Sequence, residues 1–340
     1  MARKQIIPFF IPHYGCEFEC VFCNQYKITQ AKPILGGIPA SLKLELSKLI
    51  SGEYEIAFYG GSFTALSIEE QHSFLEPAAS YIRKNPNCSI RLSTRPDCID
   101  EETVSRLKSY GVTTIELGAQ SMCNHVLALA NRGHTCEDVV RASRIIKKSN
   151  ISLILQMMTG LPGDTFEGAI DTARKIAELK PEGVRIYPTV VIEDTKLHDM
   201  WKLGTYKAHS INEAVEFCSE ICLIFDRANI KIIRLGLNPT DELSSGKVIA
   251  GAYHPGLGEM VYSRVCRRLV EKKLREVIIS GQAIERIEII VSKGFLSKMI
   301  GQNKENVKYF KEKYAVKEVV IIESEKASAS AIVPEIKIKL

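Results

Sequence analysis

The sequence predicts an α/β fold built on a parallel β-sheet, followed by a small α/β domain. Six short apolar segments alternate with helical patterns along the first two thirds of the chain. These segments are apolar almost throughout, as expected for strands that a parallel sheet buries on both faces. Six such strand–helix units fit either an open doubly wound sheet or an incomplete barrel. In both architectures the chemistry lies at the carboxyl ends of the strands.

The elements of this first part follow from the apolar pattern. Strands are expected at residues 6–11, 54–59, 88–93, 112–118, 151–158 and 184–191, with a further candidate at 230–235. Helices are expected at residues 40–50, 68–84, 100–110, 122–148, 166–179 and 212–228. The pattern then changes to a polar, glycine-containing stretch from residue 236 to residue 255, which predicts a boundary.

A second, smaller unit is expected at the carboxyl end. A basic helix at 263–278 precedes strand 286–292, helix 294–300, helix 305–314, strand 318–323 and a candidate strand at 335–340. We therefore divide the chain into a parallel-sheet unit (1–235), a connecting helical segment (236–280) and a small α/β domain (281–340).

Composition and charge narrow the class of protein. The 340 residues include 45% hydrophobic and 25% charged residues, which is ordinary for a globular protein and excludes a disordered one. No run approaches the roughly 18 apolar residues of a membrane span, and we expect a cytoplasmic protein without a signal peptide. The net charge is +5, yet residues 264–317 alone carry 14 Lys and Arg against 6 Asp and Glu. The basicity is therefore local.

Three of the ten cysteines fall within eight residues, directly after the first strand. Cys16, Cys20 and Cys23 have the spacing Cys-x3-Cys-x2-Cys. A structural zinc site needs four ligands, and the nearest candidate for a fourth is His13. A cubane iron–sulfur cluster is normally held by four cysteines, so three leave one iron open for a substrate or cofactor. A zinc knuckle or a chance grouping of buried thiols stays an alternative at this point, and the other seven cysteines are expected in the core.

With an aromatic residue at Phe22, this spacing resembles the signature of the radical S-adenosylmethionine (SAM) enzymes. The turn Gly60-Gly61-Ser62 resembles the glycine motif of that family, which binds the methionine amino group of SAM. The strings Thr-Arg-Pro-Asp at 94–97 and Asn-Arg-Gly-His at 131–134 resemble the branch of the Elongator catalytic subunit. The resemblance covers roughly residues 6–190 and implies a partial (β/α)6 barrel.

The resemblance also implies cofactors and site residues. The cofactors would be a [4Fe–4S] cluster held by the three cysteines and SAM, which the enzyme cleaves to a 5′-deoxyadenosyl radical. Arg132 would pair with the methionine carboxylate and Gln120 with the SAM ribose. The remaining cofactor contacts would be Phe22, Gly60, Gly61, Ser62, Ser93 and Gln156. The implied partner is a reducing electron donor such as ferredoxin or flavodoxin, and no membrane is expected.

The basic carboxyl-terminal segment resembles the helix–loop–helix of a KH domain, in which a glycine loop clamps the nucleic-acid backbone. Ile300 and Gly301 are kept, whereas Lys304 stands where the second glycine belongs. The candidate RNA contacts are Lys298, Gly301, Lys304 and Lys308. The alternative is a solvated basic face on a domain that packs against the barrel.

Together these patterns favour an enzyme that modifies RNA, most plausibly a tRNA base, by radical chemistry. The chain is expected to lack the acetyltransferase domain of the Elongator subunit. Arg185, Tyr187 and His134 are candidates for the substrate side of the barrel. Two alternatives are a radical SAM enzyme for a small molecule such as a tetrapyrrole precursor, and an RNA-binding protein whose cluster is structural or senses redox state.

Overall fold

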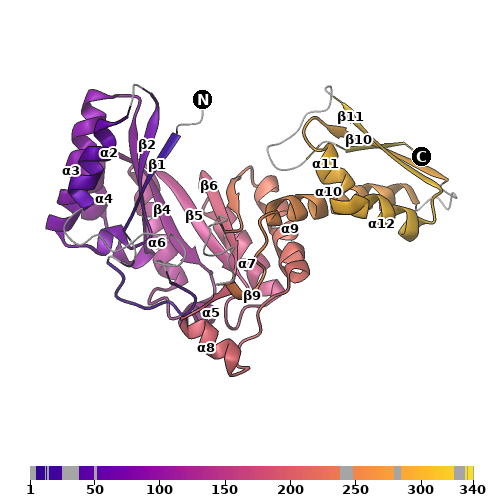
Figure 1. Cartoon of the computed structure of the whole chain (residues 1–340), viewed down its shortest axis with the longest axis horizontal. Coiled ribbons are helices and arrows are strands. Elements are labelled where there is room, and N and C mark those ends of the chain that lie inside the picture. Colours follow the sequence, from indigo (N-terminus) through magenta and orange to yellow (C-terminus); the bar gives the residue numbers. More distant parts are fainter. Residues whose placement is uncertain are drawn as a thin grey trace.

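The computed structural model describes residues 5–11, 13, 15–24, 38–49, 52–237, 248–278, 285–324, 334 and 336–339. Within them lie a sheet of seven strands, a sheet of three and a sheet of two. The large sheet with its helices and the small sheet form two lobes joined by a long helix (Figure 1).

The large sheet is parallel and curled into a half-barrel. Its strands lie side by side in chain order: β1 (Gln5–Phe10), β2 (Tyr54–Tyr59), β3 (Ser89–Thr94), β4 (Val112–Gln120), β5 (Ser152–Thr159), β6 (Gly183–Pro188) and β8 (Lys231–Leu235). The helices that connect them are α2 (Ile38–Ser47), α3 (Ile68–Lys84), α4 (Glu101–Ser109), α5 (Asn124–Leu129), α6 (Cys136–Lys148), α7 (Phe166–Glu178) and α9 (Ile211–Arg227). The predicted partial barrel is confirmed.

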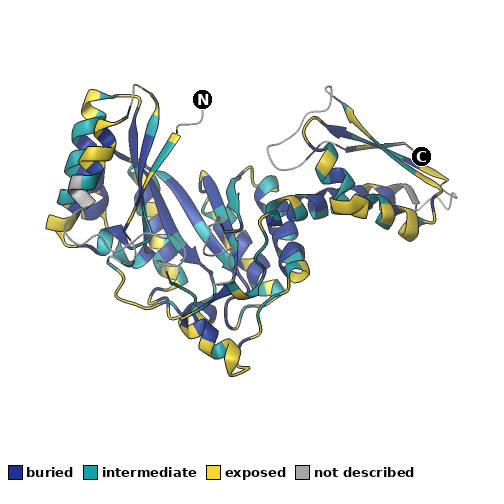
Figure 2. Ribbon diagram, viewed as in Figure 1, coloured by how far each residue is buried: buried dark blue, intermediate teal, exposed yellow. Residues whose placement is uncertain are grey.

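Local sequence explains where these helices begin and why they cover the sheet. Ser67, Thr135 and Ser210 each form a capping box that satisfies the first amide groups of α3, α6 and α9. Apolar residues at alternate strand positions, among them Phe58, Leu92 and Leu117, are fully buried against the helices. Figure 2 shows this burial along the strands and on the inner helix faces.

Two predicted elements are each divided in the structure. The prediction of one strand at 184–191 is wrong. Strand β6 ends at Pro188, which has no amide hydrogen to donate. Thr189 N donates instead to Thr159 O at 2.9 Å. The next strand, β7 (Val190–Ile192), pairs with β9 (Val248–Gly251). The prediction of a single helix at 122–148 is also wrong, because the structure has two helices there, α5 and α6.

That helix is interrupted between α5 and α6. Asn131 (φ 51°) and Gly133 (φ 70°) lie in the left-handed region, which an α-helix does not tolerate. A helix that the sequence reading missed, α8 (Lys196–Lys202), starts at the N-cap residue Thr195. It lies beside the loop that carries the three cysteines, because Leu197 N donates to Val21 O at 2.7 Å.

The small lobe has its own sheet and core. Its elements are α10 (Leu257–Ile278), β10 (Arg286–Ser292), α11 (Leu296–Ile300), the 3-10 turn η4 (Gln302–Lys304), α12 (Glu305–Tyr314), β11 (Glu318–Ser324) and β12 (Ile336–Lys339). Strand β10 lies in the centre, parallel to β11 and antiparallel to β12. The strand–helix–turn–helix–strand order is the predicted one. None of the helices in the described ranges has the length and hydropathy that a membrane crossing requires.

Helix α10 belongs to both hydrophobic cores. Val261 and Val265 pack in the core of the half-barrel, whereas Cys266, Val270 and Leu274 pack in the core of the small lobe. The division of the chain at residues 235 and 280 stays a proposal, and part of the segment around these positions lies outside the described residues.

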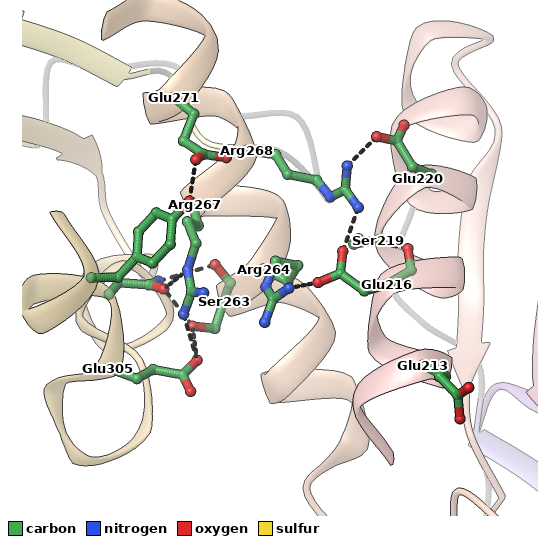
Figure 3. A network of polar contacts seen from close by, with 12 residues as sticks. Glu213, Glu216, Ser219, Glu220, Ser263, Arg264, Arg267, Arg268, Glu271 and Glu305 are labelled. Carbon is green, nitrogen blue, oxygen red and sulfur yellow. Dashed lines mark hydrogen bonds and ion pairs between the residues drawn. The ribbon is translucent and has the colours of Figure 1, made fainter. Parts of the chain in front are cut away.

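Arginines of α10 form ion pairs with both neighbouring helices (Figure 3). Arg264 and Arg268 pair with Glu216 of α9, and Arg268 also pairs with Glu220. On the other side Arg267 Nη2 lies 3.5 Å from Glu305 Oε1 of α12, and Arg267 Nε donates to Asn306 Oδ1 at 2.7 Å. Three of the positive charges that the sequence assigns to a basic surface are therefore neutralised at the junction of the two lobes.

Candidate active site

The inner face of the half-barrel carries a buried network of charged residues. Arg91 Nη2 lies 2.8 Å from Glu55 Oε2, and Arg91 Nη1 lies 3.7 Å from Glu116 Oε2. Arg185 Nε lies 2.7 Å from Glu116 Oε1. These residues come from four different strands, so the network extends across the middle of the sheet. In this low-dielectric setting each charge needs its partner, because an isolated buried charge is costly.

Glu116 is the centre of the network. It also accepts a hydrogen bond from Gln156 Nε2, so the amide expected to contact SAM is bound to a carboxylate here. Arg185 lies over the ring of Tyr59 at 5.7 Å, and burial followed by the charge of Glu116 raises the pKa of Tyr59 to about 12. Tyr59 is therefore a neutral phenol across the physiological pH range.

The loop with the three cysteines is attached to the carboxyl end of β2. Ile11 N donates to Tyr59 O at 2.7 Å, and His13 N donates to Gly60 O at 3.0 Å. Gly15 has a φ of 71°, and a Cβ atom there would collide with the carbonyl oxygen of Ser62. The cysteine loop and the glycine turn at 60–62, which the sequence separates by more than 35 residues, thus lie against each other.

The loop is held on its other side by residues 130–132. Val21 N donates to Ala130 O at 3.1 Å, and Asn131 Nδ2 donates to Glu19 O at 2.8 Å. Arg132 Nη1 donates to Cys20 Sγ at 3.0 Å, while its Nη2 donates to Gly118 O at 2.7 Å. The guanidinium of Arg132 is buried and lies directly on one of the cysteines that the sequence singles out.

The thiols differ in exposure and lie in a partly positive setting. Cys16 is exposed, whereas Cys20 and Cys23 are half-buried. Desolvation and then the neighbouring Cys20 raise the pKa of Cys16, and the guanidinium groups of Arg132 and Arg95 oppose that shift. In the described part of the chain no three His, Cys, Asp or Glu side chains converge on a single metal position. The structure therefore brings Cys16 and Cys20 near each other on one loop without closing a site around all three thiols.

The residues present nevertheless fit the expected cofactors. Cysteine thiolates on one loop are the ligands of iron–sulfur clusters. Gln120 Oε1 and Ser93 Oγ are buried polar atoms that lack a hydrogen-bond partner within the described residues. A Cβ atom at Gly118 would approach both Gln120 Nε2 (3.0 Å) and Arg132 Nη2 (3.1 Å), so these two side chains share one place at the end of β4. The guanidinium of Arg132 suits a ligand carboxylate, and the unpaired Gln120 Oε1 can accept a hydrogen bond from a ligand hydroxyl.

Sequence reasoning missed the buried charges Glu55, Arg91 and Glu116. The available signal was their alternation with apolar residues in strands β2, β3 and β4, which marks one polar and one apolar face and corrects the expectation that these strands are apolar throughout. Sequence reasoning also gave no role to Phe18 and Arg95, which contact each other beside the cysteines.

The predicted RNA-contacting residues lie in the small lobe. Lys304 and Lys308 are exposed. The ammonium group of Lys298 lies 5.0 Å from the ring of Tyr262 and 4.8 Å from that of Phe295. Gly301 (φ 76°) packs against Glu305 of α12 and Ser263 of α10. The loop therefore contacts the helix shared by both cores. These four RNA contacts stay predictions.

A parallel half-barrel with three cysteines on the loop after its first strand defines the architecture of a radical SAM enzyme. Residues 10–176 match the Radical SAM superfamily and residues 181–267 match the Radical_SAM C-terminal domain. The chain belongs to the radical SAM superfamily, whose enzymes use a [4Fe–4S] cluster and SAM.

Within the superfamily the chain is similar to Elongator-type proteins. It is 30% identical over 239 residues to the tRNA uridine(34) acetyltransferase of Methanocaldococcus infernus, covering 64% of this chain and 43% of that protein. It is 29% identical over 217 residues to Elongator complex protein 3 of Bos taurus, covering 63% of this chain and 39% of the relative. The chain thus spans about two fifths of these relatives.

A solved structure of Elp3 from Methanocaldococcus infernus, with an N-terminal deletion, superimposes with a TM-score of 0.61. The sequences are 24% identical, and the match covers 80% of this chain and 64% of the other. At this identity the likeness supports the fold.

Proposed function

We propose that this chain cleaves SAM reductively at a cluster on Cys16, Cys20 and Cys23 and modifies a base of tRNA. The observation that supports the first half is the cysteine loop held at the carboxyl end of the sheet beside Arg132 and the unpaired Gln120. In α/β sheets of this kind, ligands bind at that end of the strands.

In this proposal each group of residues binds a different part of the two cofactors. Cys16, Cys20 and Cys23 hold the cluster; Arg132 binds the SAM carboxylate and Gln120 the ribose. Gly60, Gly61 and Ser62 bind the amino group, and Phe22, Ser93 and Gln156 complete the pocket. When bound, the two cofactors supply a 5′-deoxyadenosyl radical that removes a hydrogen atom from the substrate. The protein orients the reactants and excludes water.

The RNA half of the proposal rests on the small lobe and on the relatives. One relative bears the name of a tRNA uridine(34) acetyltransferase. Lys308 and Lys311 are exposed and lie three residues apart, which places them on one side of α12, and the exposed Lys304 ends the turn η4 directly before this helix. A row of lysines is suited to phosphate contacts. An electron donor of the ferredoxin or flavodoxin type and a cytoplasmic location complete the proposal.

Anaerobic reconstitution tests the SAM half. The full chain, reconstituted with iron and sulfide and reduced with dithionite, is expected to show iron–sulfur absorbance and to form 5′-deoxyadenosine from SAM. A Cys136→Ser variant is the control, because Cys136 lies on α6 and not on the cysteine loop. Reconstituted protein that shows neither signal would refute the proposal.

Binding and nucleoside analysis test the RNA half. Wild-type chain is expected to bind total tRNA at about 50 mM salt, where phosphate-driven binding is strong. The pair Lys304→Glu and Lys308→Glu should weaken binding and lower the slope of log K against log salt, by about one for each charge lost. Lys43→Glu on α2 is the exposed control. Absence of tRNA binding, together with identical tRNA nucleosides in cells with and without the gene, would instead favour a small-molecule substrate.

A further inference from the structure

Phe18 lies between Cys16 and Cys20 and is held on two sides. The guanidinium carbon of Arg95 lies 4.6 Å from the centroid of its ring, within the range of a cation–π contact. A Cβ atom at Gly133 would collide with three atoms of the same ring, so the backbone of residue 133 packs directly on it. Gly133 also has a φ of 70°, which favours glycine for a second reason.

Arg95 is fixed in orientation by contacts within the chain. Its side chain forms a two-pronged pair with Asp97, with Nε–Oδ1 at 3.0 Å and Nη2–Oδ2 at 2.5 Å. Its backbone N donates to Ser62 Oγ at 3.3 Å, which joins it to the glycine turn. Only 5% of the residue is exposed. A buried, bidentate arginine has little freedom to move, because the planar fork fixes the side chain on its carboxylate.

Arg95 also acts on the thiols through its charge. Its guanidinium carbon lies 4.6 Å from the ring of Phe18, which stands between Cys16 and Cys20 in the chain, so its charge lies close to the cysteine loop. Asp97 balances part of that charge through its ion pair with the guanidinium. A positive group near the ligands of an iron–sulfur cluster favours the reduced, more negative state, since charge and hydrogen bonding around the ligands set the potential.

We propose that Arg95, Phe18 and Gly133 form a clamp that positions the segment from Cys16 to Cys20 for cluster binding, with Arg95 also raising the cluster potential. Arg95 and Gly133 come from the two strings, at 94–97 and 131–134, that the sequence singles out. The clamp is thus a positioning device, distinct from the SAM contacts. It rests on the proposed assignment of the cluster to the three cysteines.

The test compares variants after anaerobic reconstitution. Arg95→Met removes the positive charge and the two-pronged pair with Asp97, whereas Arg95→Lys keeps the charge alone. Phe18→Leu removes the aromatic ring, whereas Phe18→Tyr keeps it. The matched control is Arg83→Met on α3, whose arginine pairs with Glu76 at the surface. Three readouts are iron per chain, the rate of iron release to a ferrous chelator, and the midpoint potential from an optical titration with mediators. Circular dichroism verifies that each variant is folded.

The clamp predicts a graded pattern. Arg95→Met and Phe18→Leu should release iron about tenfold faster than wild type, in line with the usual effect of removing an outer partner of a metal site. Phe18→Tyr and Arg83→Met should behave as wild type. Arg95→Met should lower the ratio of reduced to oxidised cluster at fixed poise about tenfold, equal to about 59 mV for one electron, and Arg95→Lys should recover most of that shift.

Wild-type release rates and potential in Arg95→Met would overturn the proposal, as would equal release from Phe18→Leu and Phe18→Tyr. If Arg95→Met does not fold, Arg95→Lys and the two Phe18 variants decide the matter by the same release rates. A wild-type chain that binds no cluster would contradict the proposed function itself, which separates that failure from failure of the clamp.

Discussion

The half-barrel and the small lobe use their charges in different ways. In the half-barrel the charged residues lie inside, where Glu116 is 1% exposed and pairs with arginines of neighbouring strands. At the junction with the small lobe the paired residues are partly exposed, as with Arg268 (26%) and Glu216 (40%). Lys308 and Lys311 of α12 and Lys304 directly before it are exposed. A count of charges along the sequence therefore says little until burial is known.

The largest effect should come from the cysteine loop. Cys20→Ser removes a proposed cluster ligand that accepts a hydrogen bond from Arg132. We expect iron content to fall and 5′-deoxyadenosine formation to drop at least about 100-fold, beyond the effect of losing an outer partner. High-performance liquid chromatography of the reaction and iron analysis measure both. Turnover in Cys20→Ser within a few-fold of the Cys136→Ser control would contradict the assignment.

Next in size is the loss of the central carboxylate. Glu116→Gln keeps the shape of the side chain but leaves Arg91 and Arg185 without their shared counter-charge. Breaking a buried pair in this way costs about 3–5 kcal/mol of unfolding free energy. Urea unfolding measures it, with Glu102→Gln as control, because Glu102 is 89% exposed and its loss should stay within about 0.5 kcal/mol. Similar costs for both variants would remove the contrast between interior and surface charges.

The buried His134 should make the stability of the half-barrel depend on pH. Burial first, and the charge of Arg132 second, lower its pKa to about 4. Between about pH 6.5 and pH 4 the unfolded chain binds a proton that the folded chain does not, so stability falls as the pH falls through this window. We expect a loss of about 2 kcal/mol from pH 7 to pH 4.5, measured by urea unfolding. His134→Gln should lose that part of the slope; an unchanged slope would show that His134 is not its source.

The smallest effect should come from the junction between the lobes. Arg268→Ala and Glu216→Gln break half-buried pairs, for which we expect a coupling of about 1 kcal/mol or less in a double-mutant cycle. The coupling should shrink further when the salt concentration is raised. A coupling as large as the cost of Glu116→Gln would mean that the junction is as buried as the interior of the half-barrel.

Much of the fold was predictable because its local signals agree. The limits of β2, α3, β10 and α12 follow the expected ranges, since their apolar periods agree with the turn residues beside them and, in α3, with the capping box at Ser67. The break at 131–133 was not foreseen, because helical periodicity on both sides hides a short left-handed turn. The strand predicted at 184–191 failed because two sheets share one apolar run, which only tertiary pairing divides.

The candidate site was predictable in part. The spacing of Cys16, Cys20 and Cys23 and the string at 131–134 could be read directly, since their residue types are tied to chemistry. The contact of Arg95 with Phe18 could not, because it joins residues 77 positions apart and depends on how two loops fold. Nor could the sequence show that Gln156 donates to Glu116, since that depends on the alignment of β4 and β5.

The sharing of α10 between the two cores sets the angular relation of the lobes. Val265 packs on one core and Cys266 on the other, without a flexible segment between them. Each residue of an α-helix turns the chain by about 100° and advances it by about 1.5 Å. A single residue inserted after Val265 would therefore rotate the small lobe and its lysines by about 100° around the helix axis. The number of residues in this helix therefore fixes the direction in which the small lobe faces.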